Sequence, residues 1–266
     1  MSPDPDGYLL GARQPATGDR LAALAAVFDP WTRAHLDRTG LRKGWRCWEV
    51  GAGGPSVARW LAERTGPEGH VVATDIDTTW LQGMTEPNVT VLGHDVTVDA
   101  PPGAGFDLVH ARLVLVHLPD RDAALRSMAG SLRPGGWLVV EDADPLLQPR
   151  SAVDPAGPED ELANRLRDGF RSLLSDRGAD LGFGRTLARR LRAAGLVSVE
   201  ADAYLAVSIR ACAAIESTTV ALLRDQIVSR EIATDAEIDR HLDAVASGRL
   251  DLAQPPLVTA WGRRPG

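Results

Sequence analysis

The strongest constraint on the fold is a regular alternation of apolar, strand-like runs and amphipathic helical segments between residues 46 and 143. The predicted strands are RCWEV (46–50), HVVATD (70–75), VTVLGHD (89–95), FDLVHA (106–111) and GWLVVEDA (136–143), and the predicted helices are 56–66, 78–84 and 119–132. Strands that alternate with helices form a parallel sheet with both faces covered. The sequence therefore predicts an α/β fold built on a Rossmann-like, doubly wound sheet.

The flanking segments predict more helices than a minimal doubly wound unit needs. Residues 18–40 indicate two helical pieces that break at Asp29-Pro30, because proline suits the first turn of a helix. Helical blocks at 144–183 and 209–248 surround another strand (197–207), and LVTAWGRR predicts a final one. We expect a single domain over 1–266, with an N-terminal helical cap (1–44), a cofactor-binding core (45–143) and the two blocks as cap or lid insertions.

Composition and charge argue against several classes of function. The chain has 266 residues, a net charge of −7 and no run of Lys or Arg, so a nucleic-acid partner is not expected. Cys47 and Cys212 lack a CxxC or His spacing, which predicts reduced thiols and no metal site. Neither a signal-peptide pattern nor an apolar run of about 20 residues occurs. We expect a cytoplasmic protein that is not membrane-bound, and the sequence leaves a homodimer open.

The stretch EVGAGGPSVARW (49–60) lies between the first predicted strand and its helix. In an open parallel sheet, ligands bind beyond the carboxyl ends of the strands, where the strand order reverses. Gly51 and Gly53 allow a tight turn and a close approach of the backbone to a ligand. The pattern predicts a cofactor loop, although two glycines alone also occur in structural turns.

Two carboxylates end the strands that follow this loop. Asp75 ends the second predicted strand, where a carboxylate can accept both hydroxyl hydrogens of a ribose, and Asp95 ends the third, where it can meet an adenine amino group. Each could instead be a solvated residue at a strand end. Suitable groups at three strand ends, in order, favour a cofactor that contains adenosine.

Glu49 and Pro55 distinguish between cofactors of this kind. A dinucleotide places its pyrophosphate at the helix N-terminus, where an unpaired Glu49 would repel it. Pro55 lacks the backbone N–H that a phosphate-binding loop needs, and its fixed φ suits the start of a helix. S-adenosylmethionine (SAM) carries an ammonium group and no phosphate, so the loop favours SAM.

Several segments together resemble the class I SAM-dependent methyltransferases: EVGAGG, VVATDID, GHDV, FDLVHARLVLVHL and LRPGGWLVVED. The resemblance is strong over about residues 40–145, and the N-terminus is similar to the caps of bacterial small-molecule members, of the type 11 and type 25 kind. It implies a seven-stranded sheet whose last strand is antiparallel, in agreement with LVTAWGRR. Pro55 departs from the common GxGxG pattern, which concerns the conformation of the loop more than the cofactor.

The resemblance also implies roles for individual residues. Glu49, Gly51, Ala52, Gly53 and Arg112 would lie along the methionine part of SAM; Asp75 would hold the ribose, Ile76 would pack on the adenine, and Asp95 and Val96 would address its edge. The residues that would act on the acceptor are expected after the fourth and fifth strands.

His117 is the first candidate for catalysis. The spacing from Arg112 to His117 resembles a segment of the phosphoethanolamine methyltransferases in which the His assists the reaction, although Leu113 stands where those enzymes carry an Asp. Tyr8 is a possible counterpart of their N-terminal Tyr. His117 could equally be a structural hydrogen-bonding residue.

Three further ionisable side chains lie within or at the ends of the fourth and fifth strands. Asp142 and Asp144 end the fifth strand and could act as a base or cap a helix, whereas His110, within the fourth strand, is better interpreted as a buried core residue. A base is needed only if the nucleophile arrives protonated.

The sequence thus predicts a SAM-dependent methyltransferase that acts on oxygen or nitrogen of a small molecule, in secondary metabolism. The alternatives are a carboxyl or peptide methyltransferase of a natural-product peptide, and a SAM-binding protein without turnover.

Overall fold

The computed structural model describes residues 15–266, so the predicted site residue Tyr8 lies outside the described part of the chain. The elements in chain order are α1 (Pro15–Arg38), β1 (Arg46–Val50), α2 (Ser56–Thr65), β2 (His70–Asp75), the 3-10 turn η1 (Thr79–Leu81), β3 (Val89–Gly93), β4 (Phe106–Arg112), η2 (Leu115–His117), α3 (Arg121–Ser131), β5 (Leu132–Ala143), α4 (Pro158–Asp176), η3 (Gly184–Thr186), α5 (Leu187–Ala193), β6 (Val197–Tyr204), α6 (Arg210–Ser229), α7 (Asp235–Ala246) and β7 (Leu257–Arg263).

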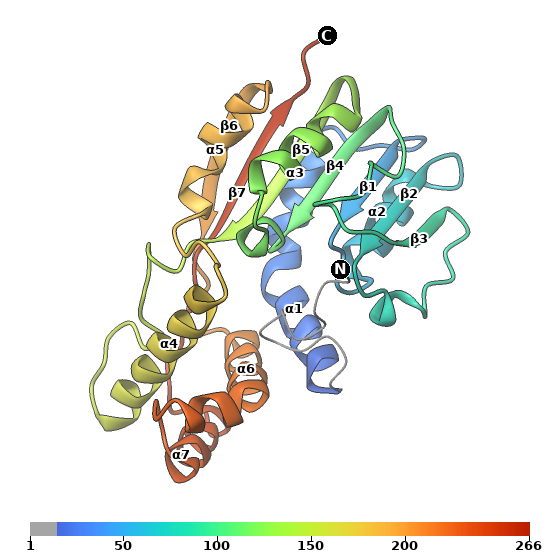
Figure 1. Ribbon diagram of the computed structural model, residues 1–266. Coiled ribbons are helices and arrows are strands. Elements are labelled where there is room, and N and C mark those ends of the chain that lie inside the picture. Colours follow the sequence, from blue (N-terminus) through green and yellow to red (C-terminus); the bar gives the residue numbers. More distant parts are fainter. Residues whose placement is uncertain (1–14) are drawn as a thin grey trace. The chain divides into compact units, whose positions relative to one another are not determined.

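The strands form one seven-stranded sheet in the order β3-β2-β1-β4-β5-β7-β6 (Figure 1). Strands β1 to β5 pair in parallel, whereas β7 is antiparallel to both β5 and β6. The predicted doubly wound sheet with an antiparallel last strand is therefore confirmed. The strand order reverses between β1 and β4, which is where ligands bind in sheets of this kind.

Helix α1 corrects the expectation of two helical pieces, because it continues unbroken through Asp29 and Pro30. A proline inside a helix removes one backbone hydrogen bond. Pro30 is exposed, and the flanking side chains of Asp29 and Trp31 are tied to the sheet region by hydrogen bonds to Arg112 and Thr259. These tertiary contacts stabilise a helix that local preference alone would interrupt.

Several boundaries also differ from the prediction. Strand β3 ends at Gly93, so Asp95 follows this strand rather than ending it, and β5 begins at Leu132 rather than at residue 136. The helix expected at 78–84 is only the turn η1, since Gly83 and Pro87 disfavour a longer helix. Strand β6 ends at Tyr204, three residues before the expected boundary.

The main hydrophobic core joins α1 and α2 to one face of the sheet. Its members include Leu36, Val57, Leu61, Cys47, Leu108 and Val139. Trp48 points to the opposite face, because neighbouring strand residues alternate, and packs against Phe106 with the ring centroids 5.8 Å apart. Cys47 and Cys212 are free and buried, and burial raises the pKa of the Cys47 thiol well above its usual value.

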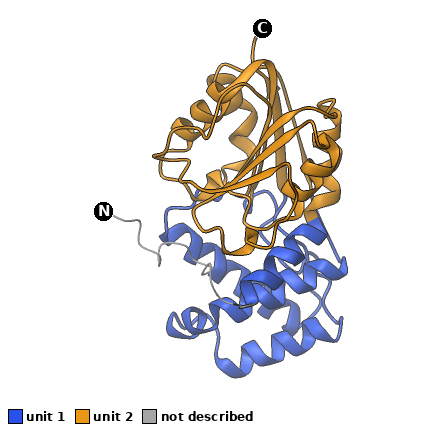
Figure 2. Cartoon of the chain, turned by 90° about the vertical axis from the view of Figure 1, so that its right-hand side faces the viewer, with its two compact units in different colours: residues 1–27, 145–181, 205–256 blue, residues 28–144, 182–204, 257–266 orange. Residues whose placement is uncertain are grey.

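The chain divides into two compact units (Figure 2). Unit 2 (residues 28–144, 182–204 and 257–266) contains the whole sheet, and unit 1 (residues up to 27, 145–181 and 205–256) contains α4, α6 and α7, which pack on one another. No helix within residues 15–266 is long and apolar enough to cross a lipid bilayer. The division into cap, core and insertions that the sequence suggested stays a prediction.

Candidate cofactor-binding and active site

The loop after β1 has the backbone that its glycines predicted. Gly51 and Gly53 adopt φ values of 61° and 60°, in the left-handed region that favours glycine. A Cβ atom on Gly51 would lie 2.4 Å from Cγ2 of Val114, so the loop and the segment after β4 approach too closely for any side chain. Pro55 takes the N-cap position of α2 with a φ of −78°.

Asp75 faces this loop from the end of β2. Its Oδ2 accepts a hydrogen bond from the Gly53 N–H at 2.8 Å, and its Oδ1 accepts one from the Asp77 N–H at 3.0 Å. Burial raises the pKa of the Asp75 carboxyl, and the two N–H bonds oppose this shift. Ile76 follows with 70% of its side chain exposed, so an apolar surface lies directly beside this carboxylate.

Asp95 and Val96 follow β3. Oδ1 of Asp95 accepts hydrogen bonds from the N–H and the hydroxyl of Thr97 at 2.8 and 2.6 Å, which closes a local turn, while Val96 is buried. The Asp95 side chain is therefore partly used in shaping its own turn.

Glu49 lies in a buried polar row across the sheet. Its Oε2 is 2.6 Å from Nδ1 of His110, the residue beside it on β4, and Nε2 of His110 is 3.3 Å from Oε2 of Glu141 on β5. The Glu141 carboxylate also accepts hydrogen bonds from the hydroxyls of Thr32 on α1 and Thr259 on β7, the latter at 2.7 Å. His110 is completely buried and bonded through both ring nitrogens, as its position in an apolar strand suggested.

Arg112 is the next residue of β4 on the same face. Its Nη1 donates to Oδ1 of Asp29 at 3.0 Å and to the hydroxyl of Thr32 at 2.9 Å. Asp29 also pairs with Arg33 at 3.0 Å and accepts from the hydroxyl of Ser56, the first residue of α2, at 3.4 Å. Helix α1 thus connects the start of α2 with the end of β4.

Sequence reasoning missed Asp29, Thr32, Glu141 and Thr259 as members of this region. The available signal was a charged residue inside an apolar run, as in VVED, because a charge in a buried strand requires partners.

Of the catalytic candidates among the described residues, His117 lies beyond the end of β4 and Asp142 is the penultimate residue of β5. His117 is half-buried at the end of η2, and Leu113 before this turn has a φ of 58°, a strained backbone for a non-glycine residue. Oδ2 of Asp142 accepts the Val116 N–H at 3.0 Å, so Asp142 holds the turn that carries His117. Burial raises the pKa of Asp142 to about 7.

Asp144 has a different environment. It is buried and pairs with Arg185, whose Nη2 and Nε atoms lie 2.6 and 2.7 Å from its carboxylate oxygens. Asp144 therefore anchors the start of η3, and its carboxylate is engaged in a bidentate ion pair.

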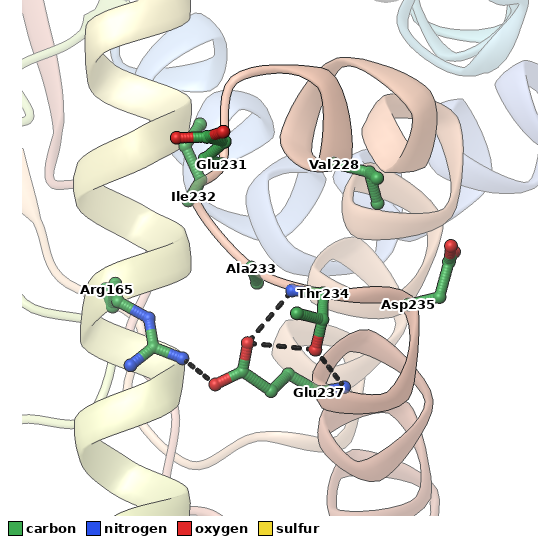
Figure 3. Close-up of a pocket in the computed structure, with 8 residues that line it drawn as sticks. All are labelled: Arg165, Val228, Glu231, Ile232, Ala233, Thr234, Asp235 and Glu237. Atoms are coloured by element: carbon green, nitrogen blue, oxygen red, sulfur yellow. Dashed lines mark hydrogen bonds and ion pairs between the residues drawn. The ribbon is translucent and has the colours of Figure 1, made fainter.

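A separate surface hollow of about 500 Å³ lies in unit 1, lined by residues of α4, α6, α7 and the connection between α6 and α7 (Figure 3). Figure 3 shows Arg165 paired with Glu237, and the same carboxylate bonded to Thr234 in a capping box. The polar groups that point into it are largely used by one another, so we do not assign the cofactor to it. Among residues 15–266, no group of three or more His, Cys, Asp or Glu side chains could hold a metal ion.

Comparison with known proteins identifies the family. A family profile described as "Methyltransferase domain" matches residues 22–201. The chain belongs to this family, and its sheet has the topology of the class I methyltransferases, which use SAM.

Individual relatives are more distant. The ubiquinone/menaquinone biosynthesis C-methyltransferase UbiE of Vibrio parahaemolyticus is 33% identical over 132 residues, which cover 46% of this chain and 51% of that protein. The match thus spans about half the length of this curated relative.

Two solved structures show the same fold at low identity. Phosphoethanolamine N-methyltransferase 2 of Haemonchus contortus, solved with phosphomonomethylethanolamine and S-adenosylhomocysteine, has a TM-score of 0.60 and 16% identity, covering 97% of this chain and 60% of that chain. The [4+2]-cyclase SpnF has a TM-score of 0.52 and 19% identity, covering 89% of this chain and 81% of that chain.

Proposed function

We propose that the protein binds SAM at the loop after β1 and transfers its methyl group to oxygen or nitrogen of a small molecule. The observation that carries the proposal is the pair of carboxylates, Glu49 and Asp75, on either side of a loop whose glycines bring the backbone close and whose Pro55 offers no N–H. These carboxylate acceptors suit a cofactor with an ammonium and a ribose, and they do not suit a phosphate.

Each predicted residue then has a distinct part in binding. Glu49 accepts hydrogen bonds from the ammonium, and Asp75 accepts them from the ribose hydroxyls. Each oxygen of Asp75 already accepts one backbone N–H, and a carboxylate oxygen can accept a second hydrogen bond. The exposed side chain of Ile76 offers an apolar surface for the adenine.

The remaining predicted contacts follow from position. Asp95 and Val96 address the edge of the adenine, and Gly51, Ala52, Gly53 and Arg112 lie along the methionine part. These assignments are proposals for each residue.

The bound cofactor supplies a methyl group on a sulfonium, open to attack by a nucleophile. The protein's part is to orient the acceptor in line and to exclude water. We propose that His117, held on η2 by Asp142, removes the proton from a hydroxyl or amine acceptor. Tyr8 stays a second candidate from the sequence.

Carbon is a second candidate acceptor, because the matching curated relative is named a C-methyltransferase. A carboxyl or peptide acceptor is a third candidate. SAM binding without methyl transfer is a fourth, because the fold also occurs in a protein named a cyclase. The net charge of −7 favours a small-molecule substrate over a nucleic acid, and a homodimer, a cytoplasmic location and a role in secondary metabolism are further expectations.

Two measurements test the proposal. Calorimetry with SAM and with NAD tests the cofactor, and we expect SAM to bind, NAD not to bind, and Asp75→Ala to weaken SAM binding through loss of a charged acceptor. Incubation with SAM and a cell extract should release S-adenosylhomocysteine together with a methylated product detectable by mass spectrometry. Binding of NAD in place of SAM would overturn the cofactor, and SAM binding without release would favour a non-catalytic protein.

A further inference from the structure

Three buried ionisable side chains form a continuous row that ends beside the cofactor loop: Glu49, His110 and Glu141. We propose that His110 is a positioning residue for the amino group of the cofactor. Its ring holds Oε2 of Glu49, which leaves Oε1 to accept a hydrogen bond from the ammonium of the cofactor. The net negative charge of the row strengthens this interaction. This inference rests on the proposed function and deepens it, since it brings a residue within β4 into cofactor recognition.

The contacts of both ring nitrogens favour a charged imidazole ring. Nδ1 lies 2.6 Å from a Glu49 oxygen and Nε2 lies 3.3 Å from a Glu141 oxygen. When both carboxyl groups are ionised they only accept hydrogen bonds, so both ring nitrogens donate to them, and only the imidazolium carries two N–H groups. Burial lowers the pKa of His110, but the two carboxylates outweigh burial and raise it to about 9, in agreement with this state.

The row then carries two negative charges and one positive charge. Glu141 receives hydrogen bonds from three donors: His110, Thr32 and Thr259. Within the described part of the chain, by contrast, the Glu49 carboxylate receives a hydrogen bond only at Oε2, from His110. The uncompensated charge and the free acceptor therefore both lie at Glu49.

Neighbouring cations do not pair with Glu49. Arg112 pairs with Asp29 at 3.0 Å, and Arg33, which also pairs with Asp29, is half-exposed to solvent. At the other end of the row, burial raises the pKa of the Glu141 carboxyl, but His110 and Arg112 outweigh burial and lower it. An unmatched charge with so little exposure to water is costly. An ammonium that reaches Glu49, two residues before Gly51, would neutralise the net negative charge of the row and form a charge-assisted hydrogen bond with the Glu49 carboxylate.

Two matched variants distinguish the contribution of Nδ1 of His110 from that of Nε2. His110→Asn keeps an N–H donor near the position of Nδ1, toward Glu49, whereas His110→Gln keeps one near Nε2, toward Glu141. Both remove the positive charge, so they differ in which carboxylate keeps its donor. Calorimetry with S-adenosylhomocysteine, which carries the amino group, and with 5′-methylthioadenosine, which lacks it, measures the effect at that end of the ligand.

We expect His110→Gln to weaken binding of S-adenosylhomocysteine about ten- to a hundredfold, the usual effect of a hydrogen bond to a charged group. His110→Asn should weaken it by less than about threefold, because the donor to Glu49 is kept. Methylthioadenosine should bind both variants as it binds the unaltered protein. Equal losses in the two variants, no loss in His110→Gln, or a parallel loss of methylthioadenosine would each overturn the inference.

The unaltered protein provides a second measurement that does not depend on the folding of a variant. Nitrogen NMR of labelled histidine should show His110 with both ring nitrogens protonated, and S-adenosylhomocysteine should shift its Nδ1 signal while methylthioadenosine should not. A singly protonated ring, or the same shift with both ligands, would overturn the inference. Failure of the unaltered protein to bind either ligand would overturn the proposed function with it, whereas equal affinity for the two ligands would overturn the inference alone.

Discussion

Gly51 shows at the scale of one residue how the loop depends on the absence of a side chain. Gly51→Ala should reduce the free energy of unfolding by about 1–2 kcal/mol because of the positive φ. The total loss should be larger, because the new Cβ would also lie 2.4 Å from Cγ2 of Val114. SAM binding should fall as the loop moves away, as calorimetry can measure. Gly44→Ala is the matched control, since Gly44 has a φ of 83° and nothing within 4 Å. Equal losses in urea unfolding for the two variants would contradict the close contact.

Asp142 makes stability depend on pH in a defined window. Burial raises its pKa from 3.8 to about 7, so between these values the folded state keeps a proton that the unfolded state releases. The contribution of Asp142 to stability is present below pH 3.8 and is lost as the pH rises through about 7. The loss is at most about 4 kcal/mol, at about 1.4 kcal/mol for each pKa unit.

Replacement by a neutral isostere tests this window. Asp142→Asn should keep the acceptor for the Val116 N–H and remove the fall in stability between pH 4 and 7, measured as the difference from the unaltered protein in denaturant unfolding. A difference that stays constant across this range would mean that Asp142 titrates normally in the folded protein.

At the scale of elements, α1 is held to the sheet by polar contacts as well as by its apolar face. Thr32→Val keeps the shape of the side chain but removes the donor to Glu141 and the acceptor for Arg112, so we expect a loss of about 1.5–3 kcal/mol, as for hydrogen bonds to charged groups. Thr39→Val, which loses only a bond to the Leu36 carbonyl, should cost about 0.5–1.5 kcal/mol. An equal or smaller loss for Thr32→Val in urea unfolding would show that the buried row does not anchor α1.

The turn η2 is the element that carries the candidate base. His117→Ala should lower the rate of methyl transfer in single-turnover experiments and leave SAM affinity largely unchanged, because His117 is not among the residues proposed to bind the cofactor, which lie near the carboxyl ends of β1 to β4. Unaltered single-turnover kinetics would reassign His117 to a structural role.

At the scale of the whole molecule, each unit has its own buried polar row. In unit 1, Arg167 on α4 lies 3.3 Å from Glu216 on α6, which is also 3.1 Å from His241 on α7. Glu216→Gln would leave Arg167 without a charged partner and should cost about 3–5 kcal/mol, as breaking one side of a buried pair does. Hydrogen exchange should quicken in α4, α6 and α7.

The surface pair of Glu159 with Arg249 provides the control for this change. Glu159→Gln removes a pair that is open to solvent, so exchange and unfolding should hardly change. Similar effects of the two substitutions would mean that the buried row in unit 1 contributes little.

The family match ends at residue 201 and so excludes α6, α7 and β7. Helices α6 and α7 therefore lie outside the region that the family profile matches, whereas α4 lies within it.

Local patterns were sufficient to predict the alternation of strands and helices and the tight turn after β1. The positive φ values of Gly51 and Gly53 and the carboxylate at the end of β2 are found as expected, whereas α1 and η1 differ from the prediction. Local features of this kind can be recognised from sequence because the physical preferences behind them act over a few residues. Binding of the cofactor at this turn stays a prediction.

The tertiary structure alone decided what Glu49 contacts and how α1 meets the sheet. Thr32 and Glu141 are 109 residues apart, and Glu49 and His110 are 61 apart, so no local pattern could pair them. Other long-range contacts, from Asp29 to Arg112 and from Trp31 to Thr259, carry α1 through Pro30 against its local preference. A buried charge is costly unless it is paired, so Glu49, His110 and Glu141 are stable in the sheet only because the fold places them beside one another. No local motif encodes this row.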